Sequence, residues 1–248
     1  MLNISLQSEY IVSLFGVALT NTFVTSLLVT LLLGSLGIFF FFKQRTHENV
    51  LVNGIRILIY ELLLLTDMVT QERELSKKIL PLIATFFLFI ITANLLALIP
   101  GFFGSFYVQE SAGRFALLRS PNSDLTTTLA LALFSVLSIQ FFSFHALGMK
   151  RYVRRFLDLT GPIKFLLGFF EMLSEGVKIL SFSFRLFGNV FAGEILLLVI
   201  AFLIPYIIPL PFMFLEVFVG IVQAFIFSML TLVFIKTSTI RHVEVKAD

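Results

Sequence analysis

The sequence predicts an all-α membrane protein: a single membrane domain over residues 1–248, with five transmembrane helices and one amphipathic helix at the membrane interface. Two observations lead to this class. The chain has 58% hydrophobic and only 13% charged residues, with a mean hydropathy of +1.01, whereas soluble proteins carry about a quarter charged residues. Its apolar residues also come in blocks of about twenty, the length that crosses a bilayer as a helix. Together these features exclude an ordinary soluble enzyme.

The first half of the chain contains three of the predicted crossings. The first covers residues 20–42 and carries no charge. The second covers 79–100, and the third covers 125–147. The stretch 48–70, between the first two, is too polar to cross comfortably, so we expect it to form a helix that lies in the interface.

The last two crossings are predicted at 180–204 and 212–235. No proline interrupts residues 163–204, and one helix of that length would extend about 63 Å, twice the thickness of the hydrocarbon layer. We therefore expect both final helices to be long and tilted. A short turn that contains Pro205, Pro209 and Pro211 separates them.

The distribution of Lys and Arg outside the crossings predicts the orientation. These residues number none before the first crossing, six after it, two after the second, six after the third, none after the fourth and three in the tail. Because positive charges concentrate on the cytoplasmic side, we expect the N-terminus outside and the C-terminus in the cytoplasm or its equivalent.

Three ionisable residues remain inside the last two crossings: Arg185, Glu194 and Glu216. A charge in lipid is costly, so the default interpretation is an ion path. The alternative is a structural ion pair, or an arginine that extends to the membrane surface. Arg185 and Glu194 lie about 180° apart around a helix, so they cannot pair within one straight helix.

Other polar residues follow helical spacing. Glu216, Gly220 and Gln223 form a stripe that should face protein or water rather than lipid. Asn189 lies one turn after Arg185. A further line approaches Arg185 from the cytoplasmic side and contains Glu171, Glu175, Lys178 and Ser181. For Glu175 and Lys178, a solvated helix face explains the pattern equally well.

Two polar residues near the ends of crossings have simpler explanations. Asn94 can bond across helices, and Asp124 precedes the third crossing in the position of a helix N-cap. The chain has no cysteine, no metal-ligand spacing of histidines and no phosphate-binding or hydrolase motif. No metal or cofactor is therefore expected.

Two longer motifs are specific. One is SFSFRLFGNVFAGE at residues 181–194, and the other is FLEVFVGIVQAFIFSMLT at residues 214–231. Shorter matches are TNTF from Thr20, ANLLALIPG at 93–101 and PNSDLTTTLALAL at 121–133. These motifs resemble those of subunit a of the F-type ATP synthase, and the resemblance covers nearly the whole chain.

The resemblance implies a proton-translocating stator subunit. Such a subunit forms two half-channels against a rotating ring of c subunits, associates with the peripheral-stalk b subunits, and couples proton flow to ring rotation and ATP synthesis without itself binding ATP. It implies an energy-coupling membrane, with the bacterial plasma membrane favoured and the mitochondrial inner membrane as the alternative.

The resemblance also assigns roles to residues. Arg185 is expected to face the ring carboxylates, because a fixed guanidinium favours their ionised form. Glu194, Glu216 and Gln223 match the outer half-channel, and Asn189 lies near the crossing point. Ser181 and Glu171 match cytoplasmic-side positions. Position 216 is often histidine in the family.

A stand-alone transporter that uses Arg185 to bind an anion is the alternative from a different class. It predicts inverted repeats or broken helices in matching halves, and the sequence contains neither. A membrane-embedded hydrolase lacks a nucleophile and base. Whether protons or sodium ions are carried stays open from this chain, because much of that choice lies in the ring.

Overall fold

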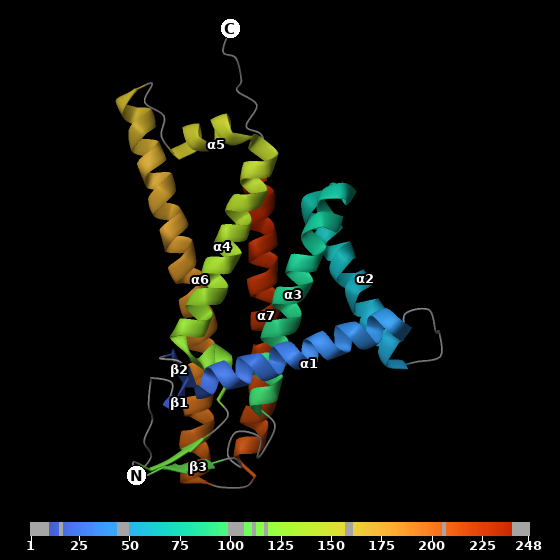
Figure 1. Ribbon diagram of the computed structural model, residues 1–248, viewed down its shortest axis with the longest axis vertical. Helices are drawn as coiled ribbons and strands as arrows, with labels where there is room; N and C mark the ends of the chain where they lie inside the picture. Colours follow the sequence, from blue (N-terminus) through green and yellow to red (C-terminus); the bar gives the residue numbers. More distant parts are fainter. Residues whose placement is uncertain are drawn as a thin grey trace.

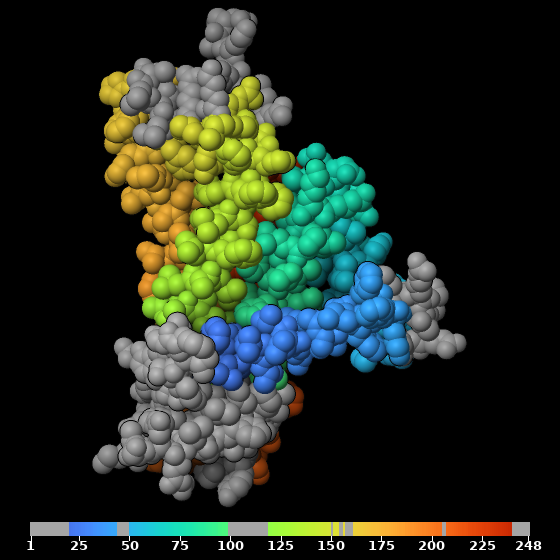
Figure 2. All heavy atoms as spheres, viewed as in Figure 1, coloured from blue at the N-terminus to red at the C-terminus, as the bar shows by residue number. Residues whose placement is uncertain are grey.

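The transmembrane helices of the protein form a bundle with one helix lying across it. The computed structural model describes residues 10–14, 17–43, 50–98, 107–110, 113–116, 119–156, 161–204 and 207–239. Within these ranges α3, α4, α6 and α7 run side by side, α2 lies against α3, and α1 runs across the bundle (Figure 1). In the space-filling view α1 lies on the outside, across the other helices (Figure 2).

All five predicted crossings are helical. The helices are α1 (Asn21–Lys43), α3 (Arg73–Leu98), α4 (Leu125–Leu147), α6 (Pro162–Leu203) and α7 (Pro209–Thr239). Each is long and apolar enough to cross a membrane. Residues 99 and 100 of the second predicted crossing, and Pro205 of the predicted turn, lie outside the described residues.

Three helices begin before their predicted crossings. α3 begins at Arg73, ahead of 79, and α6 begins at Pro162, ahead of 180, which agrees with a helix over the proline-free stretch 163–204. The predicted turn is wrong for Pro209 and Pro211, because α7 begins at Pro209 rather than at 212. The sequence prediction located apolar blocks, whereas a helix continues through polar residues until its backbone is interrupted. Gly161 and Pro162 provide that interruption for α6, because proline is well suited to the first turn of a helix. α6 is thus one helix of 42 residues.

α2 (Val50–Thr70) occupies most of the stretch predicted to be interfacial, of which residues 48 and 49 are not described. Its buried residues include Leu62 and Thr66. The helix ends at Thr70, and the next residue, Gln71, has a left-handed φ of 55°, a conformation that interrupts a helix. The location of α2 in the membrane interface remains a prediction.

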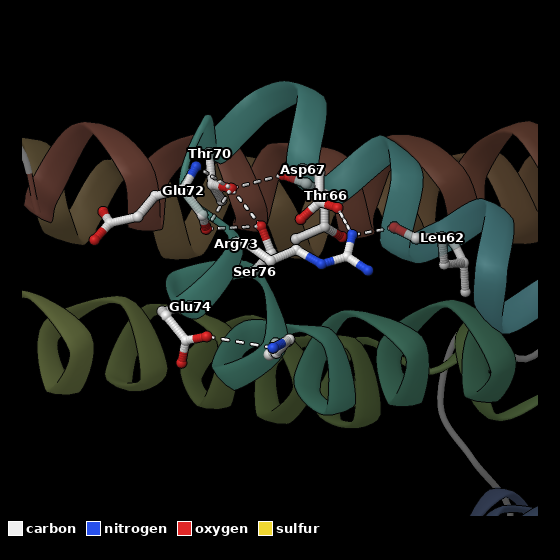
Figure 3. A network of polar contacts seen from close by, with 9 residues as sticks. Leu62, Thr66, Asp67, Thr70, Glu72, Arg73, Glu74 and Ser76 are labelled. Carbon is white, nitrogen blue, oxygen red and sulfur yellow. Dashed lines mark hydrogen bonds and ion pairs between the residues drawn. The ribbon is translucent and has the colours of Figure 1, made fainter.

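Polar contacts fix the turn from α2 to α3 (Figure 3). The hydroxyls of Thr70 and Ser76 lie 2.6 Å apart, and Arg73 forms an ion pair with Asp67. The Lys236 ammonium of α7 donates a hydrogen bond to the Thr70 carbonyl oxygen. A cation there satisfies a carbonyl at the negative end of α2, so the turn is tied to the C-terminal end of α7.

The all-α prediction did not include two short β-hairpins that the structure contains beside its long helices. β1 (Tyr10–Leu14) pairs with β2 (Val17–Thr20), and β3 (Tyr107–Glu110) pairs with β4 (Gly113–Ala116), both antiparallel. The sequence analysis did not predict them, because strands of four or five residues give too short a pattern to separate from loops. The remaining elements are the 3-10 helix η1 (Pro121–Ser123) and α5 (Met149–Phe156).

Aromatic packing holds the middle of the bundle. Phe86 of α3, Phe182 of α6 and Phe227 of α7 meet edge to face, with ring centroids 5.4 and 5.0 Å from that of Phe227. In lipid, such van der Waals contacts replace the hydrophobic effect as the force between helices. The arrangement brings α3, α6 and α7 together. Four polar residues of the last two helices lie along this junction: Asn189, Glu194, Glu216 and Gln223.

Hydroxyl pairs join α4 to its neighbours. Thr128 contacts Ser183 at 3.1 Å, and Ser135 contacts Thr231 at 2.8 Å. Further along, the Ser143 hydroxyl donates to the Ser238 carbonyl oxygen at 3.1 Å. All of these side chains are buried, so they act as interhelical hydrogen bonds rather than as solvated groups.

Candidate functional site

Arg185 lies on an exposed face of α6. Its Nη2 atom lies 3.4 Å from the Ser181 hydroxyl oxygen, to which it donates a hydrogen bond. Within the described part of the chain, the structure records no acidic partner for this guanidinium. The neighbouring Phe184 and Leu180 side chains are also exposed. A permanent positive charge thus stands on an apolar surface.

A cavity of about 50 Å³ lies on the other side of α6, at its junction with α3 and α7. It is lined by Asn94, Ala97, Leu98, Val190, Glu194, Leu197 and Glu216. Two carboxylic acids from different helices therefore share one small space that has room for water. The opposite placement of Arg185 and Glu194 agrees with the half-turn predicted between them.

Gly193 makes room for Glu216. A Cβ atom at residue 193 would overlap the Glu216 carboxylate, so a larger residue there would displace this carboxylate from its present place against α6. Sequence reasoning did not single out Gly193. The signal available to it was the small-residue pair Ala192 and Gly193 directly before the intramembrane Glu194.

Glu194 has a basic neighbour that the sequence analysis missed. The Arg119 Nε atom lies 3.9 Å from the Glu194 Oε2 atom. Arg119 was counted among the loop cations, yet the fold directs it between helices because it lies close before the N-terminus of α4. Only its position just ahead of the PNSD motif could have suggested this.

A buried network of amides joins α3, α7 and η1 beside the cavity. Asn94 donates to the Gly220 carbonyl oxygen at 3.1 Å and accepts from the Asn122 amide at 2.7 Å. Asn94 therefore bonds across helices, as the simpler interpretation expected. Asp124 is an N-cap as predicted, because it accepts from the backbone N–H of Thr126 at 2.9 Å.

A single hydrogen bond links the polar stripes of α6 and α7. The Asn189 amide donates to the Gln223 Oε1 atom at 2.7 Å, and Gln223 is buried. Its Nε2 atom is among the buried polar atoms for which no hydrogen-bond partner is recorded in the described residues. Along α6, Asn189 lies between Arg185 and Glu194, so this bond lies between the two charged positions.

The polar residues predicted to form a line toward Arg185 differ in burial and in their contacts. Glu175 is buried, and the Lys178 ammonium lies 2.8 Å from its Oε1 atom and over the Phe234 ring. A solvated face is therefore wrong for Glu175. Ser181 is exposed and contacts Arg185, whereas Glu171 is partly exposed. The fold thus brings Ser181 to Arg185 but leaves Glu171 more than three turns away along the helix.

These features define a class of protein. The chain is a multi-pass helical membrane protein. Acids and amides gather where α3, α6 and α7 meet, and one arginine, Arg185, faces outward from α6. Ionisable groups inside a membrane mark ion paths and proton relays in many membrane proteins.

Comparison with known proteins names the family. Residues 23–236 match the family described as ATP synthase A chain. ATP synthase subunit a of Moorella thermoacetica is 35% identical over 172 residues, which cover 69% of this chain and 68% of that protein. The subunit a of Geotalea daltonii is 32% identical over 203 residues, with 79% and 74% covered. That of Legionella pneumophila strain Corby is 29% identical over 237 residues, with 96% and 85% covered. The chain belongs to the ATP synthase A chain family.

Proposed function

We propose that this chain is the stator subunit that conducts protons through the membrane sector of a rotary ATP synthase. As a member of the subunit a family it is a multi-pass protein of an energy-coupling membrane and takes part in proton transport and ATP synthesis. The proposal adds that it forms two offset half-channels against a ring of c subunits, with peripheral-stalk b subunits as further partners.

The observation that carries the proposal is that Arg185 is exposed and has no acidic partner among the described residues. A guanidinium stays charged in every environment, and a charge on a lipid-facing surface requires a partner. Among the described residues Arg185 contacts the Ser181 hydroxyl and no acidic group, so in this proposal its partner comes from another subunit. A ring carboxylate meets that need, and the guanidinium would favour release of its proton.

The groups on either side of Arg185 have the chemistry of two access paths. The cavity that holds Glu194 and Glu216 supports an outer path, with Gln223 and Asn189 between it and Arg185. Ser181 and Glu171, on the other side along α6, belong to an inner path. In this arrangement Arg185 separates the paths and repels protons, which prevents a direct leak between them.

Helix lengths support a tilted placement in the membrane. α1, at 23 residues, has about the length needed to cross upright. α6, at 42 residues, exceeds the hydrocarbon thickness about twofold, and α1 runs across it rather than along it (Figure 1). We propose that α1 stands upright while α6 and α7 are strongly tilted, with the N-terminus outside and the C-terminus in the cytoplasm. The relatives named above are bacterial, which favours a bacterial plasma membrane.

ATP-driven proton pumping by membrane vesicles that contain the assembled complex tests the proposal. We expect Arg185→Ala to reduce pumping to background while the complex still assembles, because the proposal assigns the contact with the ring carboxylates to this guanidinium. Lys164→Ala is the matched control, since Lys164 is an exposed cation near the start of the same helix. Unchanged pumping by an incorporated Arg185→Ala subunit would refute the stator mechanism and leave Arg185 as a structural charge.

A further inference from the structure

The backbone of Arg119 is held in place by a hydrogen bond that does not involve its side chain. Its N–H donates to the Thr25 hydroxyl of α1 at 3.3 Å. The residues that follow form η1, which leads into the N-cap Asp124 of α4, and Thr22 of α1 donates to that carboxylate at 2.8 Å. The base of the Arg119 side chain is therefore fixed by α1 and α4, independently of Glu194.

The guanidinium extends from this anchor toward the cavity wall. Its Nε atom lies 3.3 Å from the Ser123 hydroxyl and 3.9 Å from the Glu194 Oε2 atom. The Arg119 side chain is 19% exposed and that of Glu194 is 34% exposed. Both are more enclosed than the 55–75% exposed Arg73, Lys77 and Glu74 side chains of the surface pairs, so the attraction between them is less screened by solvent.

The second acid makes a cation necessary at this place. Glu194 and Glu216 line the same cavity, and two carboxylates in one enclosed space repel each other when both are charged. A fixed cation beside one of them offsets this repulsion. It also stays in place while protons move, because the guanidinium does not titrate in proteins.

We propose that Arg119 is a positioning residue of the proton path: it holds the Glu194 carboxylate at the cavity wall and offsets its charge while protons pass between Glu194 and Glu216. This inference rests on the proposed function of the cavity as part of the path. It gives the protein two arginines with different tasks, one facing a partner subunit and one serving an acid of the same chain.

Pumping by vesicles with the assembled complex measures the contribution of Arg119. We expect Arg119→Gln to lower the rate by about three- to tenfold, the size that follows from losing a partly enclosed charge pair. Arg119→Lys keeps the charge and should retain at least about half of the rate. Lys77→Gln removes an exposed cation paired with the exposed Glu74 and should leave the rate unchanged.

A double-mutant cycle separates positioning from a structural role. If Arg119 acts through Glu194, Arg119→Gln should change the rate by less than about twofold in a Glu194→Gln background, where the charge to be offset is gone. The same reduction in both backgrounds would overturn the inference. If Arg119→Gln prevents assembly, Glu194→Gln should restore it by removing the unpaired carboxylate, and failure to restore it would also overturn the inference.

The Arg185→Ala variant in the same preparations distinguishes the two proposals. Pumping that survives Arg185→Ala refutes the stator function itself. Loss of pumping with Arg185→Ala, together with full pumping by Arg119→Gln, leaves the stator function intact and removes only the role of Arg119.

Discussion

The two sides of α6 differ in the partners that surround their charged residues. On the exposed side, the partner that the described residues offer Arg185 is the Ser181 hydroxyl, at 3.4 Å. On the cavity side, Glu194 lies near Arg119, and Glu216 rests against a glycine that makes room for it. The same helix thus leaves one charge without a counter-ion and surrounds the other with basic, amide and small residues.

The difference indicates where each group meets its partner. Intramembrane charges that act within one chain are compensated by that chain, because an uncompensated charge costs several kcal/mol. An uncompensated charge on an outer face is stabilised when a second protein covers it or when its side chain extends to the membrane surface. In the proposed mechanism, the Arg119–Glu194 pair belongs to a path inside this chain, whereas Arg185, which has no acidic partner among the described residues, faces another subunit.

The sharpest way to break this contrast is to give Arg185 a partner of its own. Ser181→Glu places a carboxylate one turn before Arg185, the favourable order for a helical ion pair. We expect ATP-driven pumping to fall by about tenfold or more, because a paired arginine no longer attracts an external carboxylate. Ser181→Gln has nearly the same size without the charge, and equal losses in both variants would show that bulk rather than pairing is responsible.

On the cavity side, filling the space at Gly193 should have the next largest effect. The Cβ of Gly193→Ala would overlap the Glu216 carboxylate, and we expect pumping to fall by about three- to fivefold because the acid must leave its place. Gly176→Ala is the control on the same helix, since nothing lies within 4 Å of a Cβ there. Adding the shorter Glu216→Asp to Gly193→Ala should recover part of the rate, and a further loss instead would contradict the steric explanation.

Removing the amide network beside the cavity should affect stability more moderately. Asn94→Leu loses the bonds to Gly220 and Asn122, which we expect to lower the free energy of unfolding by about 1–2 kcal/mol. Titration with SDS in mixed micelles measures this change. Thr85→Ala is the control, because Thr85 is exposed on the same helix and donates only to the carbonyl of Pro81. Equal stability of the two variants would argue against a structural role of the network.

The smallest effect is expected at the hydroxyl pair between α4 and α7. Ser135→Ala removes the 2.8 Å contact with Thr231 and should destabilise the subunit by about 0.6 kcal/mol, the average for interhelical hydrogen bonds in a membrane protein. Ser138→Ala, which loses only a bond within its own helix, should change stability by less. The same SDS titration tests the difference, and a larger effect at Ser138 would refute this ranking.

Most of the fold follows from local composition. The five crossings could be predicted because twenty apolar residues with few charges have only one stable arrangement in lipid. The length of α6 could also be predicted, since no proline interrupts residues 163–204. The start of α7 at Pro209 could not, because proline suits both a turn and the first turn of a helix. The hairpins β1–β2 and β3–β4 were missed because their pattern is too short.

The candidate site was predicted unevenly. Arg185, Glu194 and Glu216 were found because an ionisable residue inside an apolar block is conspicuous at any position. Arg119 and Asn122 escaped notice because they lie in polar surroundings along the chain, where charge and amide groups need no explanation. Their importance comes from the helices they meet, and no helical spacing connects them to Glu194.

By itself the sequence determined the class of the protein, the number of crossings and the placement of Arg185 and Glu194 on opposite sides of one helix, because these depend on composition and on the helical repeat. The tertiary structure decided which groups meet: Arg119 with Glu194, Asn94 with Gly220, and Glu216 with Gly193. Each of these contacts joins residues from different elements or depends on how two helices approach. Such contacts depend on how the helices pack, and helix packing cannot be deduced from the spacing of residues along one chain segment.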